Sequence, residues 1–239
     1  MEGGLFNPRP RVERVEFADG QFCLVVDDAL QRPDRLRALA CHDRAYFRQG
    51  AQHAYPGVEL PMADDVARQL DEFFCLHIRK ALGARRTLRM YCRMAMTLLP
   101  AHELQARQWL CHRDGAWVKP GETIAASVLY LFDDPTLGGT SFYAPTQDAA
   151  VTDRLVHDSC TLDNESFTAR HGIEPGYMSG SNAYFREIGR VEARWNRMLF
   201  YDGFIFHSGN ISTPQALVDD PMSGRLTLNG FFTCSALAS

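Results

Sequence analysis

The sequence predicts a single α+β domain that is mainly β, with helices toward its beginning and strands over the rest. Two amphipathic segments lie before residue 85, and short apolar or alternating segments separated by turn residues follow it. Runs of short strands of this kind are typical of β-sandwiches and barrels. A chain of 239 residues is long enough for one large core. We therefore expect one domain over 1–239, with a helical part at about 1–85 packed on one face of a sheet built from about 86–235.

The expected helical part begins with a strand. Residues 21–30, "QFCLVVDDAL", are apolar and end in two aspartates, which is typical of a strand that runs into a turn. Residues 32–47 have helical spacing. The clearest amphipathic helix is 62–83, "MADDVARQLDEFFCLHIRKALG", whose apolar residues recur along one stripe and whose last glycine is a stop signal.

Strand-like segments dominate after residue 85. The expected strands are "TLRMYCRMAMTLL", "TIAASVLYLF", "GTSFY", "RMLFYD", "FIFH" and "GRLTLNGFFTC". Between them, about 144–194 is polar, rich in turn formers and weakly periodic. A connection of that length in a compact domain is usually a binding insertion, a helical excursion or a lid. We expect one or two short helices there, and a lid-like role in substrate specificity.

Composition and charge argue against several classes of binding partner and of cellular location. The net charge is −4 and the pI is about 6.1, without a basic block of the kind that binds nucleic acid. The start of the chain lacks a secretory signal, and no apolar run is long enough to span a membrane. The seven cysteines are scattered without a C-x-x-C pair, which argues against disulfides and structural zinc. We expect a cytoplasmic protein, and the sequence does not indicate its oligomeric state.

One polar stretch, "QWLCHRDGAW", carries His112 and Asp114 with one residue between them. Residues at i and i+2 point the same way from an extended strand, so both side chains can reach one divalent metal. A His-x-Asp triplet also arises often by chance, and a solvated loop is the plain alternative. A third ligand would have to come from far along the chain. His207, directly after an aromatic strand, is the candidate.

Four segments taken in order resemble a known family. "CHRD", "ASVLYLFDDPTLGGTSFY", "RMLFYDGFIFHSG" and "GRLTLNGFF" look like successive core strands of the non-haem Fe(II)/2-oxoglutarate-dependent oxygenase superfamily, prolyl-hydroxylase-like branch. The resemblance covers about 94–232 and implies a double-stranded β-helix, or jelly-roll, core. Two features depart from the family pattern: the Gly-Gly-Thr turn is slightly offset, and Arg225 lies further from His207 than is usual, after a longer loop.

The resemblance implies a ligand set and a reaction. Fe(II) would be held by His112, Asp114 and His207, and 2-oxoglutarate would chelate it while O2 is consumed. The far carboxylate of 2-oxoglutarate would pair with Arg225, with Thr227 and Tyr130 as further contacts. β-Core packing is the plain alternative for Tyr130 and Thr227, and a surface salt bridge is the alternative for Arg225. Halogenating relatives have a small residue in place of the metal-binding carboxylate. The presence of Asp114 therefore favours hydroxylation, with formation of succinate and CO2.

The identity of the substrate does not follow from the fold. A small polar molecule, an amino acid or a peptide side chain all remain open. Two other functions also remain: a jelly-roll binding module without activity, and a cupin-like metalloenzyme that does not use 2-oxoglutarate. The intact set His112, Asp114 and His207 argues against the first, and Arg225 with Thr227 on one late strand argues against the second.

Overall fold

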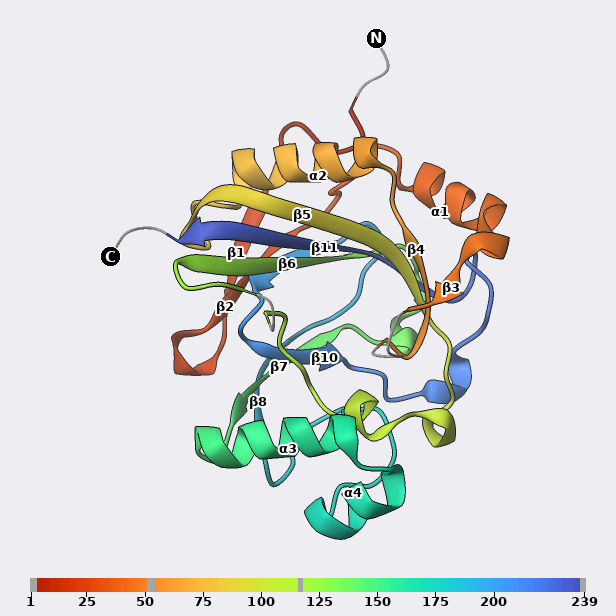
Figure 1. The fold of residues 1–239 in the computed structure, drawn as a ribbon. Coiled ribbons are helices and arrows are strands. Elements are labelled where there is room, and N and C mark those ends of the chain that lie inside the picture. Colours follow the sequence, from red (N-terminus) through yellow and green to blue (C-terminus); the bar gives the residue numbers. More distant parts are fainter. Residues whose placement is uncertain (1–3, 51–54, 116–117, 237–239) are drawn as a thin grey trace.

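The computed structural model describes residues 4–50, 55–115 and 118–236, and it is dominated by two antiparallel sheets (Figure 1). The larger sheet has the strand order β1-β2-β9-β6-β11-β5-β4-β3, and the smaller has the order β10-β7-β8. Their strands are β1 (Val12–Glu16), β2 (Phe22–Val26), β3 (Arg48–Gln49), β4 (Gly57–Pro61), β5 (Ala84–Thr97), β6 (Glu122–Tyr130), β7 (Thr140–Pro145), β8 (Phe185–Val191), β9 (Met198–Asp202), β10 (Phe206–Gly209) and β11 (Arg225–Ala236).

One helix, α2 (Asp64–His77), packs on the outer side of the larger sheet, and Figure 1 shows it alongside β5. A second helix, α1 (Pro33–His42), contributes Leu36 and Ala40 to the same apolar cluster. The ring of Phe74 stacks on that of Phe232 from β11, with ring centroids 4.0 Å apart. Met94 and Met96 of β5 are buried in the same apolar cluster. Neighbouring residues of a strand point to opposite faces of the sheet. Ala95, between Met94 and Met96, therefore faces the other way, toward the smaller sheet.

The space between the two sheets contains a second apolar cluster. Tyr130 from β6, Phe142 from β7 and Tyr201 from β9 are buried there. The rings of Phe142 and Tyr201 meet edge to face at 5.1 Å. Antiparallel sheets that face each other around a shared interior are consistent with the jelly roll that the sequence resemblance implies.

Two regions differ in detail from the sequence-based expectations. The part expected to be helical, 1–85, contains α1 and α2 but also β1 to β4, which extend both edges of the larger sheet. Of these, β2 is the strand predicted within 21–30, whereas β1, β3 and β4 are too short for their period to be distinguished in the sequence. The expected insertion at 144–194 contains two short helices, as predicted, α3 (Ala149–Thr161) and α4 (Asn164–His171). It also contains β8, which pairs with β7.

Short 3-10 turns complete the connections, and they are η1 (Ala18–Gly20), η2 (Arg44–Tyr46), η4 (Ala101–Glu103), η5 (Ala106–Gln108), η6 (Pro135–Leu137) and η7 (Pro214–Ala216). All seven cysteines are free thiols. Among the described residues, the helices are too short or too polar to cross a bilayer.

Phe74→Ala tests the contact between α2 and the larger sheet. Removing a fully buried ring that stacks on Phe232 should lower the free energy of unfolding by about 3–5 kcal/mol. Urea denaturation followed by circular dichroism measures this change. Leu76→Ala is the matched control, because Leu76 is on the same helix but 77% exposed, and its effect should stay within about 0.5 kcal/mol. Equal losses in the two variants would contradict the packing described.

Candidate metal centre

A pair of backbone hydrogen bonds places the first half of the site against the second. The His112 N–H donates to the carbonyl of His207 at 2.9 Å, and the His207 N–H donates to the carbonyl of His112 at 2.8 Å. Two residues on, the Asp114 N–H donates to the Gly203 carbonyl at 2.7 Å. The segment with the His-x-Asp triplet is therefore a short extended piece beside β10, and the alternation within it brings His112 and Asp114 to the same side.

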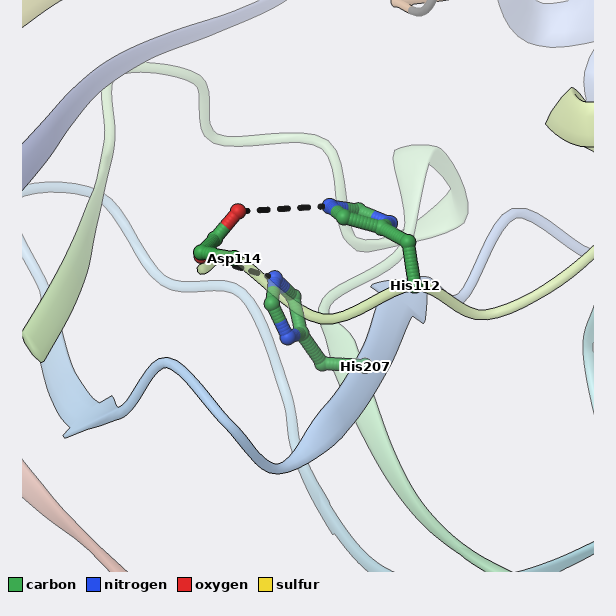
Figure 2. A group of neighbouring side chains, drawn as sticks. All are labelled: His112, Asp114 and His207. Carbon is green, nitrogen blue, oxygen red and sulfur yellow. Dashed lines mark ion pairs between the residues drawn. The ribbon is translucent and has the colours of Figure 1, made fainter. Parts of the chain in front are cut away.

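The three side chains converge (Figure 2). One donor atom from each of His112, Asp114 and His207 lies within 4.8 Å of the other two. Nε2 of His112 is 3.9 Å from Oδ1 of Asp114, and Nε2 of His207 is 3.5 Å from Oδ2 of Asp114. Among the described residues, this is the one His, Cys, Asp and Glu cluster with such spacing. The structure thus joins residues that are far apart in the sequence, as the resemblance implies.

The surroundings of the two imidazoles leave nitrogen lone pairs available at the centre. Nδ1 of His207 lies 2.9 Å from the Ile205 carbonyl, which can only accept, so Nδ1 carries the proton and Nε2 presents its lone pair. Desolvation and the positive charge of Arg93 lower the pKa of His112. This imidazole is therefore neutral at pH 7, although 61% of its side-chain surface is accessible.

Asp114 completes the centre at an energetic cost. Its side chain is 8% exposed, and Oδ2 is buried without a hydrogen-bond partner in the described structure. Burial raises the pKa of Asp114, while the positive charge of Arg93 lowers it. A buried oxygen without a partner, 3.5 Å from the unprotonated Nε2 of His207, is unfavourable unless a cation occupies the space between them. The donor set, two imidazoles and one carboxylate, is the facial arrangement that non-haem Fe(II) uses. These residues therefore fit a bound metal.

Arg225 lies at the start of β11 and is buried, with 5% of its surface exposed. Its Nε donates to the Leu137 carbonyl at 2.9 Å, and its Nη2 donates to the Gly139 carbonyl at 3.1 Å. The turn between those carbonyls needs glycine, because a Cβ on Gly138 would lie 1.8 Å from the Asn210 carbonyl oxygen. No carboxylate among the described residues pairs with Arg225. It is thus a fixed, buried cation without a counter-charge.

The other two expected co-substrate contacts share the inner face with Arg225. Thr227 is two residues along β11, and its register partner on β6 is Tyr130. Tyr130 is fully buried, and its hydroxyl is 2.7 Å from Oγ1 of Thr140. Burial raises the pKa of Tyr130 to about 12, despite the opposing charge of Arg225, so the phenol keeps its proton. Thr227 Oγ1 makes a long hydrogen bond of 3.4 Å to the Ala95 carbonyl.

Two residues beside Arg225 carry no motif that could reveal them in the sequence. Thr97 of β5 lies opposite Arg225 in register, with its Oγ1 3.4 Å from Nη1. The hydroxyl of Tyr55 is 2.8 Å from the same Oγ1. Both belong to the region before the His-x-Asp triplet, and only the pairing of β4 and β5 with β11 brings them to this end of the barrel.

Two neighbouring polar groups have structural partners. Arg113 pairs with Asp153 of α3 at 3.1 Å and lies over the Phe206 ring. Asp158 is buried and its Oδ2 lies 2.9 Å from Nε2 of His171, while its Oδ1 lies 3.5 Å from Nδ1 of the exposed His157. The hydrogen bond between Asp158 and His171 connects α3 to α4.

A model described as "Family of unknown function (DUF6445)" matches residues 8–232 of the chain. A comparison with curated proteins finds no match.

Several solved structures share the general arrangement of the chain. A Pseudomonas putida prolyl-4-hydroxylase is 15% identical, with 88% of this chain and 91% of that one covered and a TM-score of 0.42. The non-haem α-ketoglutarate-dependent epimerase SnoN from nogalamycin biosynthesis is 13% identical, with coverage of 89% and 78% and a TM-score of 0.46. HygX from Streptomyces hygroscopicus, solved with nickel and 2-oxoglutarate, is 12% identical, with coverage of 89% and 82% and a TM-score of 0.45. At these identities and TM-scores the likeness assigns neither a superfamily nor an activity to this chain.

Asp114→Asn tests whether the centre is strained without a metal. An amide N–H can donate toward the lone pair on Nε2 of His207, so the chelator-treated variant should be more stable than the chelator-treated wild type by about 1–3 kcal/mol. Urea denaturation at pH 7 measures the difference. Asp153→Asn, which changes an exposed carboxylate, should have an effect within about 0.5 kcal/mol. A less stable Asp114→Asn protein would show that the carboxylate has a protein partner.

Proposed function

The chain belongs to the DUF6445 family, a family of unknown function, and we propose that it is an Fe(II)- and 2-oxoglutarate-dependent dioxygenase. The observation that carries the proposal is the convergence of His112, Asp114 and His207, with a buried carboxylate oxygen that has no protein partner. The reaction would use O2 to oxidise an organic substrate and would convert 2-oxoglutarate to succinate and CO2.

His112, Asp114 and His207 would hold the metal, with the two imidazoles binding through Nε2. A divalent iron held by these three residues would supply the oxidising chemistry when 2-oxoglutarate and O2 are present. The protein backbone fixes the orientation and spacing of the two imidazole rings. The Ile205 carbonyl orients the ring of His207, and the paired backbone hydrogen bonds between His112 and His207 set the spacing of the two rings.

Arg225 would bind the far carboxylate of 2-oxoglutarate. Three of its five N–H groups are directed to the carbonyls of Leu137 and Gly139 and, in a long contact, to Oγ1 of Thr97, which leaves two N–H groups of a rigid guanidinium for an anion. Tyr130 and Thr227 are on the same inner face and would add hydroxyl contacts. A buried arginine without a carboxylate partner is costly in the free protein, and a bound dicarboxylate would remove that cost.

Hydroxylation is the outcome that the site favours. Asp114 occupies the position where a carboxylate ligand excludes a halide from the metal. The substrate would be a small polar molecule, an amino acid or a peptide side chain. The seven free thiols fit a reducing compartment, which supports a cytoplasmic location.

Asp114→Ala tests the metal assignment. Wild-type protein given Fe(II), ascorbate and O2 should convert 2-oxoglutarate to succinate slowly even without substrate, and the variant should lose this turnover because one of three ligands is gone. Succinate is measured by mass spectrometry, and the fold is checked by circular dichroism. Asp153→Ala is the control and should keep wild-type turnover. A folded Asp114→Ala protein with normal turnover would defeat the assignment.

Arg225→Ala tests the co-substrate site. The variant should bind 2-oxoglutarate more weakly by about 2–5 kcal/mol, the scale for leaving one partner of a buried charge pair alone. Isothermal titration on Zn(II)-loaded protein measures the affinity without turnover. Arg113→Ala, which removes an exposed arginine from the His-x-Asp triplet, should bind as the wild type does. An unchanged affinity in Arg225→Ala would exclude this arginine from the site.

A further inference from the structure

A second arginine, Arg93 of β5, lies inside the barrel close to the metal centre. In the register of β5 with β11, Arg93 is opposite Asn229, Ala95 is opposite Thr227 and Thr97 is opposite Arg225. These alternate residues share the inner face, because Met94 and Met96 between them are packed in the core under the helices. The guanidinium lies over the ring of Phe231, whose register partner on β6, Ala126, is opposite Tyr201 of β9. The Tyr201 ring meets that of His207 with centroids 4.7 Å apart, so Arg93 lies level with the triad along the strands.

The terminal nitrogens of Arg93 have no partner in the described part of the chain. Nε lies 3.0 Å from Oε1 of Glu59 on β4, an ionic contact in which the buried N–H makes no hydrogen bond. The guanidinium carbon is 5.1 Å from the centre of the Phe231 ring and 5.8 Å from that of Tyr55. These contacts position the planar fork, and no protein acceptor uses Nη1 or Nη2. The side chain is 23% exposed, so the fork is reachable from outside.

Arg93 and Arg225 can hold two different anions. The four residues from Arg93 to Thr97, which is opposite Arg225, correspond to about 13 Å along the strand. Arg225 is enclosed by backbone carbonyls at one end of the barrel, whereas Arg93 lies between aromatic rings on the side of the triad. The position of Arg225 suits the buried end of the co-substrate. The position of Arg93 suits the substrate, which would bind after the co-substrate.

The charges near Arg93 favour a carboxylate over a more highly charged group. Glu59 already neutralises part of the arginine charge, and a phosphate dianion would be repelled by it. A carboxylate matches the fork of two terminal nitrogens in a bidentate pair. Asn229 is opposite Arg93 on the same face, and its amide has no partner among the described residues, so it can add a neutral hydrogen bond.

We propose that Arg93, assisted by Asn229, binds a carboxylate of the substrate and thereby directs one of its C–H bonds to the metal centre. The proposal rests on the proposed function and specifies the substrate class: a small molecule with a free carboxylate, such as an amino acid or another organic acid. Glu59 is an ionic neighbour of Nε that would compete with the substrate carboxylate for the charge of Arg93.

The test uses Zn(II)-loaded protein, which binds ligands without turnover, and saturation-transfer NMR. The probes are 2-oxoglutarate, the twenty common amino acids with their N-acetyl derivatives, and the primary amide of each. We expect at least one acid to give a signal that its amide lacks. That signal should fall at least tenfold in Arg93→Met and persist in Arg225→Met. The 2-oxoglutarate signal should show the reverse dependence.

Each other outcome has a distinct meaning. If no acid binds better than its amide, or if the acids depend on Arg225 and not on Arg93, the proposal is wrong. If the 2-oxoglutarate signal is lost in Arg93→Met, Arg93 belongs to the co-substrate site and the proposal is also wrong. If acids respond to Arg93 while 2-oxoglutarate does not bind the wild type, the carboxylate site stands and the oxygenase assignment fails.

Glu59→Gln provides a second variant in case Arg93→Met does not fold. It keeps the cation and removes the competing anion, so the acids should bind several-fold more tightly than they bind the wild type. An unchanged or weaker affinity would contradict the role given to Arg93.

Discussion

The two backbone hydrogen bonds between His112 and His207 are the constraint on which the site depends. They fasten a segment that belongs to no long strand against β10, whose other neighbour is β7. Side-chain direction in an extended segment follows from this register, so a shift by one residue would turn His112 and Asp114 away from His207. The third link, from the Asp114 N–H to the Gly203 carbonyl, fixes the same register at the other end of the triplet.

The interior built around this register is poorly balanced in charge and hydrogen bonding. One oxygen of Asp114 has no partner, Arg225 has no counter-ion in the described structure, and the fork of Arg93 has no acceptor. Groups of this kind lower the stability of the free protein. Each is complemented by one component of the proposed reaction: a divalent metal, the far carboxylate of the co-substrate, and a carboxylate of the substrate. Such groups make the free protein less stable and favour ligand binding, as is usual where function requires buried charge.

Much of the frame could be predicted from the sequence. Residues 123–132 and 224–234 alternate or run apolar over the length of a strand, and they correspond to β6 and β11. His112, Asp114 and His207 could be nominated because the order of four motifs resembles a family, and the structure brings the three together. The roles of Arg93, Thr97 and Tyr55 could not be predicted from the sequence. Their positions depend on how β4 and β5 pair with β11, and Arg93 within "YCRMAM" looks like one more charge on a long strand. The strands β1, β3 and β4 were missed for a similar reason, because pairing within the sheet, and not local period, decides them, whereas the apolar run of β2 was recognisable.

The most direct test of the account is the visible spectrum of the protein with Fe(II) and 2-oxoglutarate in the absence of O2. A keto acid chelated to Fe(II) gives a metal-to-ligand charge-transfer band. The account predicts this band in the wild type and its loss in His207→Ala, with His157→Ala, an exposed histidine on α3, unchanged. Iron bound without the band would contradict the use of 2-oxoglutarate and favour a cupin-like enzyme. The absence of iron binding in the wild type would contradict the metal centre itself.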